Sequence, residues 1–291
     1  MDTAGRYDRG RFTVVAYPRD AALARSLLAA AAARDSFPGL PRPRARAVIA
    51  LAPDRARFRA LTGGAAPEWG AAVAFPAAQR IVMQGQRAGS DAGDPAEVLR
   101  HELAHLALHE ALGGLPPRWF DEGYASYAAG EWGRDELLAT NVALVLGPIP
   151  SLAGLDSGFY RGASTAEASY ALAYRAVAEL AALDRERGLT LFFEHWREGG
   201  SLEQAVRLAY GLTLPGFEQR WQTRTRRRYG ALAAATDVTV ASAIFVGMLF
   251  PLWLMRRRRD RRRLADLRAA DVEAERRARE SMLEALLRQP E

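Results

Sequence analysis

Cysteine and lysine are both missing from this sequence of 291 residues, and histidine occurs only four times. The lack of cysteine excludes disulfides and thiolate metal sites, while an oxidising compartment stays permitted. All 40 basic residues are therefore arginines. Because alanine is also abundant, we attribute the arginine to GC-rich coding rather than to phosphate recognition.

The positive charge is concentrated at one end of the chain. Residues 256–291 hold twelve arginines against eight acidic residues, so they contribute +4 of the net charge of +6. The preceding 255 residues are close to neutral at +2, which removes the main support for binding to nucleic acid. With 49% hydrophobic residues, the chain is able to bury a real core as one large domain or two small ones.

One long apolar run stands out in the sequence. Residues 238–255, VTVASAIFVGMLFPLWLM, are eighteen consecutive uncharged positions, which as a helix would span about 27 Å of the ~30 Å hydrocarbon core of a bilayer. A buried core helix is the alternative, but RRRRDRRR at 256–263 would end it against seven arginines. We therefore predict a transmembrane helix, so that a lipid bilayer is a partner. The arginines fit a stop-transfer signal better than a separate site for anionic lipid headgroups.

The charges on either side of this segment predict its orientation. The fifteen residues after it contain eight arginines and the fifteen before it contain four. The positive-inside rule therefore places the C-terminal tail in the cytoplasm and residues 1–237 outside. The first seventeen residues contain no apolar export segment. We expect a signal peptide upstream of Met1; the alternative is an inverted orientation that translocates the Arg-rich tail.

The pattern of apolar residues predicts an α+β fold. Short β-rich stretches precede Asp94, and the pattern is helical after it. The predicted strands are 11–17, 45–52, 71–76 and 80–86, the last two as a hairpin, and the predicted helices of this part are 20–34 and 54–64.

Four parts of the chain follow from these patterns. They are an α/β sheet part at 1–90, a helical catalytic part at 91–230, the transmembrane helix at 238–255 and an Arg-rich tail at 256–291. The tail is expected to be helical, although its apolar spacing is too irregular for a coiled coil.

The first helix of the catalytic part has clear signals at both ends. DPAE at 94–97 is a capping box with aspartate in place of serine or threonine, and its proline suits the first helical position. Gly113 and Gly114 end the helix, and the two prolines that follow prevent it from resuming. These signals predict a helix over 95–112.

This helix carries HELAH at residues 101–105. His101 and His105 are four residues apart and project from the same face, so both imidazoles are able to reach one ion at ~2.0–2.1 Å. Glu102 is rotated by about 100° from His101, which suits a group that holds a water molecule without being a ligand. This is the HExxH arrangement of zinc hydrolases. His109 lies about 12 Å from His101 along a straight helix, so we interpret it as a flanking or core histidine.

A third ligand is predicted from a second helix within 116–130, whose first turns contain Glu122. Helices joined by a tight turn tend to lie antiparallel, which would bring Glu122 back over His101 and His105. Two histidines, one carboxylate and an open position are typical of a catalytic zinc site, whereas a structural site has four protein ligands.

HELAH together with WFDEGYASY at 119–127 is similar to the gluzincin metallopeptidases, the group of thermolysin and aminopeptidase N. The similarity is greatest to their compact bacterial branch, the peptidase MA-like domains, and extends over about residues 10–225. The resemblance implies Zn²⁺ bound by His101, His105 and Glu122, with Glu102 as general base and later proton donor.

The resemblance also implies a group that stabilises the oxyanion and an edge strand that binds an extended substrate. In EASYALAY at 167–174, Tyr170 matches the family pattern better than Tyr174, although both tyrosines suit a helical core equally. The strand at 80–84 is expected to be the edge strand, because it comes just before the metal-binding helix.

Two departures from the family narrow the predicted function. Asp121 stands where aminopeptidase-type members have asparagine, which leaves metal binding in place. No motif like Gly-Ala-Met-Glu-Asn is present to bind a substrate amine, which favours an endopeptidase, or an exopeptidase of another kind, over an aminopeptidase. We expect a membrane-anchored zinc metallopeptidase acting on peptides or proteins. The alternative is a catalytically silent, membrane-tethered binding or signalling module, and the intact Glu102 argues against it.

Overall fold

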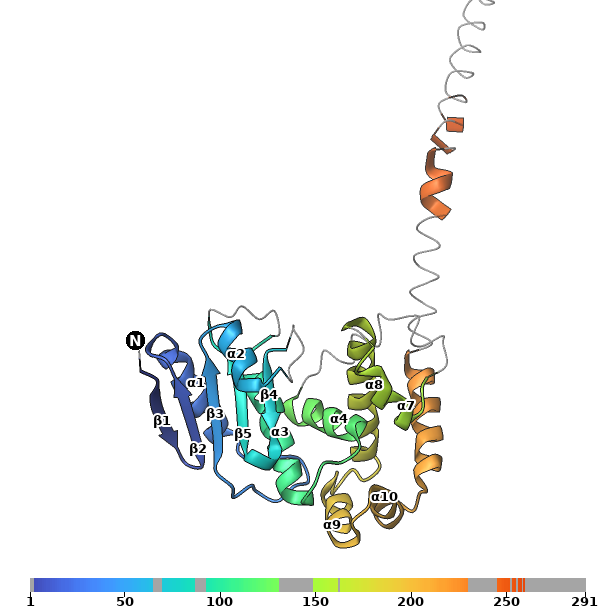
Figure 1. The fold of residues 1–291 in the computed structure, drawn as a ribbon. Helices are drawn as coiled ribbons and strands as arrows, with labels where there is room; N and C mark the ends of the chain where they lie inside the picture. Colours follow the sequence, from blue (N-terminus) through green and yellow to red (C-terminus); the bar gives the residue numbers. More distant parts are fainter. Residues whose placement is uncertain are drawn as a thin grey trace, which may run out of the picture. The chain divides into compact units, whose positions relative to one another are not determined.

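The computed structural model describes most of the chain (Figure 1). The described residues are 3–64, 70–86, 93–130, 149–161, 163–229, 245–251, 253–254, 256–257 and 259. The chain divides into two compact units, Met1–Ala233 and Ala234–Glu291. The first unit contains both the sheet and the predicted catalytic helices. Of the second unit, residues 245–251 are helical.

A mixed five-stranded sheet forms the N-terminal part of the first unit. Its order is β1-β2-β3-β5-β4. The outer pairs β1–β2 and β5–β4 are antiparallel, and β2–β3–β5 are parallel. The strands are β1 (Gly5–Arg9), β2 (Phe12–Ala16), β3 (Ala47–Ala52), β4 (Ala72–Phe75) and β5 (Arg80–Gln84). The α+β class, with a small N-terminal sheet followed by helices, and the hairpin are therefore confirmed.

The edge strand next to the helical part is β4, so the prediction that residues 80–84 form the edge is wrong. The short 3-10 helix η2 (Pro76–Ala78) and the left-handed Gln79 (φ 48°) turn the chain back on itself. This turn places β4 on the outer side of β5, with Ala74 paired to Ile81. β5 is consequently paired on both sides, to β3 and to β4.

Alternate residues of the central strands bury against opposite faces of the sheet. Ile81 and Met83 of β5 belong to the main core, which α1 (Ala21–Ala33) and α3 (Pro95–Leu112) complete. Val82 lies between them in the strand and packs instead with Phe58 of α2 (Arg55–Thr62). This period of two is the expected pattern for a strand covered on both faces. As a result, α3 lies against one face of the sheet, in contact with β4 and β5.

The remaining helices pack on α3, on α4 and on one another. They are α4 (Arg118–Ala129), α7 (Leu152–Gly158), α8 (Ala163–Ala181), α9 (Thr190–Gly199), α10 (Leu202–Tyr210) and a last helix at 214–229. A short 3-10 helix, η1 (Pro18–Asp20), precedes α1. Their shared core is rich in large aromatic side chains, among them Phe120, Tyr124, Phe192, Phe193 and Trp221. This core fixes α4 between α3 and α8 (Figure 1).

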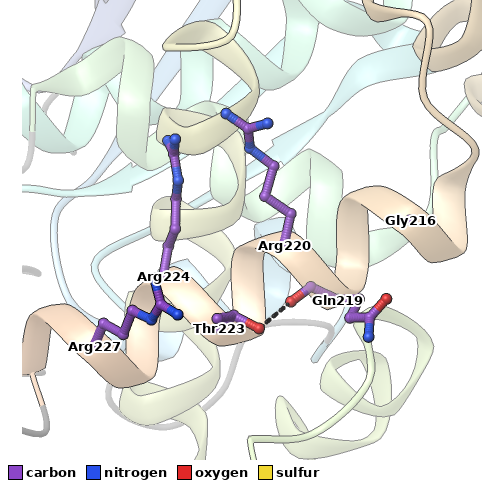
Figure 2. Close-up of a pocket in the computed structure, with 6 residues that line it drawn as sticks. All are labelled: Gly216, Gln219, Arg220, Thr223, Arg224 and Arg227. Atoms are coloured by element: carbon purple, nitrogen blue, oxygen red, sulfur yellow. Dashed lines mark hydrogen bonds between the residues drawn. The ribbon is translucent and has the colours of Figure 1, made fainter.

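A buried carboxylate ties the last helix to α8. Glu179 of α8 accepts a hydrogen bond from Arg224 Nη1 at 2.6 Å and lies 3.6 Å from Arg220 Nε. Figure 2 shows both arginine side chains extending on one side of the helix at 214–229, where they line a surface pocket of about 390 Å³. Because none of its lining residues belongs to the histidine-bearing helix, we treat this pocket as separate from the predicted site.

Among the described residues, no helix is long and apolar enough to cross a membrane. Half of the segment 238–255 and nearly all of the tail at 256–291 lie outside the described residues. The predictions for these two segments therefore stay predictions.

Candidate metal centre

The helix α3 begins and ends where its sequence signals predict. Asp94 Oδ1 accepts a hydrogen bond from the backbone amide of Ala96 at 2.8 Å, and Pro95 is the first helical residue. At the other end, Gly113 adopts the left-handed conformation with φ 72° and closes the helix. A side chain with Cβ would be strained at that φ, which explains the glycine. The helix therefore carries His101 and His105 on consecutive turns, as predicted, with Glu102 next to His101.

The helix α4 brings Glu122 to α3 and packs closely against α8. A Cβ added to Gly123 would lie 2.4 Å from the carbonyl oxygen of Ala173, a distance that no real Cβ contact tolerates. The backbone amide of Trp119 donates to Asp156 Oδ1 at 2.7 Å, which connects the start of α4 to α7. Glu122 precedes Gly123 in the chain, so this close packing of α4 against α8 fixes the position of the Glu122 backbone, from which its side chain extends.

Three side chains converge on one point between α3 and α4. His101, His105 and Glu122 each offer one ligand atom, and these atoms lie within 4.8 Å of one another. Glu122 Oε2 lies 3.5 Å from His101 Nε2 and 3.7 Å from His105 Nε2. All three side chains are only 10–13% exposed. The arrangement that the sequence predicts for these residues is thus present in the structure.

Asp121 fixes the orientation of one imidazole. Its Oδ1 lies 2.7 Å from His105 Nδ1. Because a carboxylate oxygen only accepts, Nδ1 is the donor and Nε2 is left to face Glu122. Burial alone lowers the pKa of His105, but the charge of Asp121, its hydrogen bond and the charge of Glu122 raise that pKa to about 9.

The donor set fits zinc. A histidine that donates one ring N–H to a carboxylate and presents the other nitrogen is the usual geometry of a zinc ligand. Two imidazole nitrogens and a carboxylate oxygen match three-ligand catalytic zinc sites. Burial raises the pKa of Glu122, but the hydrogen bond from His101 and the charges of the two histidines and Arg118 lower it overall. Glu122 is therefore ionised, as a metal ligand must be.

Glu102 lies beside the three converging side chains and also contacts the sheet. The backbone of Ala74, in the edge strand β4, interacts with its carboxylate and favours the charged form. Burial raises the pKa of Glu102 above its usual value, and the nearby His105 and His101 offset this only in part. A carboxylate with a raised pKa beside a metal centre is suited to accept and return a proton.

The two candidate tyrosines occupy different environments. Tyr170 is partly buried, packs edge-on against Phe159 with ring centroids 4.9 Å apart, and acts electrostatically on Arg118, which in turn contacts Glu122. Tyr174 is only 4% exposed and packs against Tyr127. Tyr170 is therefore the tyrosine on the side of the centre, while its catalytic role stays a prediction. His109 is not part of the converging group.

Sequence reasoning missed the contacts that two neighbours of Glu122 make. The sequence identifies Asp121 only as a replacement for asparagine, yet its carboxylate accepts a hydrogen bond from His105. Arg118 precedes Glu122 by four residues, and its Nη2 lies 3.4 Å from Glu122 Oε1. The i, i+4 spacing of opposite charges is a signal that could have found the second contact.

Comparisons with known proteins agree with this geometry. Residues 64–226, more than half of the chain, match the peptidase MA superfamily. The matched range contains β4, β5, α3, α4 and α8, and so every residue of the candidate centre. No curated protein matches the chain.

Proposed function

The chain belongs to the peptidase MA superfamily, and from this premise we propose that it is a zinc-dependent metallopeptidase that hydrolyses peptide bonds. One observation carries the proposal: the Nε2 atoms of His101 and His105 both face the same oxygen of Glu122. Glu102, next to His101 in the chain, has the environment of a general base. These features support an enzyme rather than a fold kept for binding alone.

Each residue of the candidate centre has a separate role in the proposed hydrolysis. Zinc held by His101, His105 and Glu122 supplies Lewis acidity, which makes a water molecule more acidic and a carbonyl carbon more electrophilic. The Glu102 carboxylate accepts a proton from water as its oxygen attacks the scissile carbonyl. Glu102 then returns this proton to the leaving nitrogen, so that a free amine and a carboxylate result. The hydroxyl of Tyr170 donates a hydrogen bond to the oxygen that becomes negative.

The edge strand suggests how a substrate binds. β4 is paired with β5 on one side only among the described strands, and an extended peptide is able to add to such an edge through backbone hydrogen bonds. The interaction between Ala74 and Glu102 supports a substrate bound along this edge, beside the proposed base. We propose an endopeptidase whose substrate binds along β4 rather than along the strand at 80–84.

We further propose that residues 238–255 anchor the catalytic unit to a membrane, with the catalytic unit extracytoplasmic and the Arg-rich tail cytoplasmic.

The test compares two glutamates of the same helix. Glu102→Gln removes the proposed base, whereas Glu97→Gln changes an exposed glutamate in the first turn of α3. Zinc content and casein cleavage are measured for the wild type and both variants, with and without a chelator. We expect one zinc per chain in all three and chelator-sensitive cleavage in the wild type and Glu97→Gln. Glu102→Gln should be slower by about 10²–10⁴-fold, the usual contribution of a general base.

The opposite results would contradict the proposal in different ways. A wild type that binds zinc but cleaves neither casein nor a peptide library would be a silent module. A Glu102→Gln variant as active as Glu97→Gln would show that Glu102 is not the base.

A further inference from the structure

Arg118 is the residue beside the metal centre to which neither the sequence motif nor the proposed mechanism assigns a role. It is the first residue of α4, one helical turn before Glu122. Its Nη2 lies 3.4 Å from Glu122 Oε1, and its side chain is 38% exposed. Because Glu122 is only 13% exposed, this ion pair is screened by water less than a pair on the open surface.

The contacts of Glu122 divide its two oxygens between different partners. Oε2 is the atom that faces both imidazoles, at 3.5 Å from His101 and 3.7 Å from His105. Oε1 is the atom that faces Arg118. A carboxylate attached through rotatable bonds would otherwise be able to exchange these atoms or turn away, so the arginine selects one orientation.

The guanidinium group of Arg118 also contacts two aromatic residues that are distant in the sequence. Its Nη1 donates a hydrogen bond to the Tyr160 hydroxyl. The Tyr160 and Phe159 rings lie with their centroids 4.5 and 5.3 Å from the guanidinium carbon. Phe159 packs in turn against Tyr170 of α8. The planar group is thus fixed by a hydrogen bond and two rings, in a position where its other amino group meets Glu122.

An ordinary ion pair of the same spacing shows the difference. Arg207 and Glu203 of α10 are also four residues apart, at 3.2 Å, but their side chains are 60% and 57% exposed. Such surface pairs contribute little. Arg118 differs in that its partner is a nearly buried carboxylate that faces two histidines.

We propose that Arg118 is a positioning residue of the metal centre, which holds Oε1 of Glu122 so that Oε2 is presented to the ion. This inference rests on the proposed function, because it requires that His101, His105 and Glu122 bind zinc. Outer-sphere partners of this kind commonly change metal affinity by about 10–100-fold. The predicted consequence is a weaker and differently coordinated ion when the guanidinium is removed.

The experiment measures metal binding rather than peptidase activity. Zinc affinity is determined by competition with a chromophoric chelator for the full chain and for Arg118→Gln, Arg118→Lys and Arg207→Gln. We expect Arg118→Gln to bind zinc about 10–100-fold more weakly. Arg118→Lys should fall between, because an ammonium keeps the charge but does not contact Glu122 and Tyr160 together. Arg207→Gln should bind like the wild type.

A second readout separates positioning from general stability. The visible absorption bands of the cobalt-loaded protein should change in Arg118→Gln and not in Arg207→Gln, while the melting temperatures of the metal-free proteins stay close. Should Arg118→Gln fail to fold, Arg118→Lys decides by the same measurements. Zinc affinities and cobalt spectra equal to the wild type in the folded Arg118 variants would overturn this inference and leave the proposed function standing. A wild type that binds no zinc would overturn both.

Discussion

Two glutamates of this protein are nearly buried and have arginine partners, yet their surroundings differ. Glu179 is 2% exposed and meets three guanidinium groups, from Arg175 at 3.3 Å, Arg220 at 3.6 Å and Arg224 at 2.6 Å. Glu122 is 13% exposed and meets one guanidinium and two imidazoles. The two carboxylates are alike, so their roles depend on the residues around them.

The difference lies in which partners are able to lose a proton. Arginine keeps its charge at any physiological pH, so the charge of Glu179 is permanently balanced and the cluster joins α8 to the last helix. Histidine, unlike arginine, is able to lose its proton and then presents a lone pair. The group around Glu122 is therefore able to exchange protons for a cation, whereas the group around Glu179 is not. Burial and charge alone do not distinguish a structural carboxylate from a metal ligand; the protonation chemistry of its neighbours does.

The most direct test of this comparison replaces each of the two glutamates and measures zinc binding. Glu122→Ala should weaken zinc binding by more than about 100-fold, beyond the usual loss for an outer-sphere partner, because a ligand is removed. Glu179→Ala should leave the zinc affinity of the folded protein unchanged. Chelator competition on both variants measures this. Equal zinc affinities in the two would show that Glu122 is not a ligand.

For the free energy of unfolding of the metal-free protein, replacing Glu179 should have a larger effect than replacing Glu122. Glu179→Gln leaves three arginines around a neutral amide and should lower the free energy of unfolding by about 3 kcal/mol, the lower end for a broken buried pair, because Arg220 and Arg224 are half exposed. Glu122→Gln should change it less. Urea denaturation in the presence of a chelator checks both values, and a larger loss for Glu122→Gln would contradict this account.

The close approach of α4 to α8 should also be measurable. Gly123→Ala forces a methyl group against the Ala173 carbonyl and should lower the free energy of unfolding by about 1–3 kcal/mol through overpacking. It should also weaken zinc binding, because Glu122 moves with α4. Gly114→Ala is the control, since a Cβ there meets nothing within 4 Å. Similar unfolding curves for the two variants would show that α4 tolerates the displacement.

The last prediction concerns the pH dependence of zinc binding. A proton on His105 competes with zinc, so zinc affinity should rise about tenfold per pH unit up to the pKa of about 9 and then level off. Asp121→Asn removes the charge that raises this pKa, so its affinity should level off at a lower pH. Zinc titrations between pH 6 and pH 10 in a chelator buffer compare the two proteins, and a wild type that levels off near the ordinary histidine value of 6.5 would refute the role of Asp121.

Much of the centre was predictable because its signals are local. The cap at Asp94 and the glycine at Gly113 define α3, and the HELAH spacing then places two histidines on one face of that helix. The position of Glu122 followed from a proline break and a second helix. Such features depend on residues within one or two turns of each other, which is why the sequence alone predicts them.

The features that the sequence did not reveal depend on distant contacts. β1, GRYDR, is mostly exposed and lacks an apolar pattern, and its pairing with β2 is what makes it a strand. The identity of the edge strand depends on which side of β5 the hairpin folds back. The anchoring of Arg118 requires Tyr160, which is 42 residues away and is placed by the end of α7.

The central claim is that one zinc ion is held by His101, His105 and Glu122. Crystals of the zinc-loaded protein measured at the zinc absorption edge test it most directly. We expect one anomalous peak per chain between α3 and α4, at ~2.0–2.1 Å from both Nε2 atoms and ~2.0–2.2 Å from Glu122 Oε2. An absence of zinc there, or zinc bound with the Glu122 side chain turned away, would contradict the account.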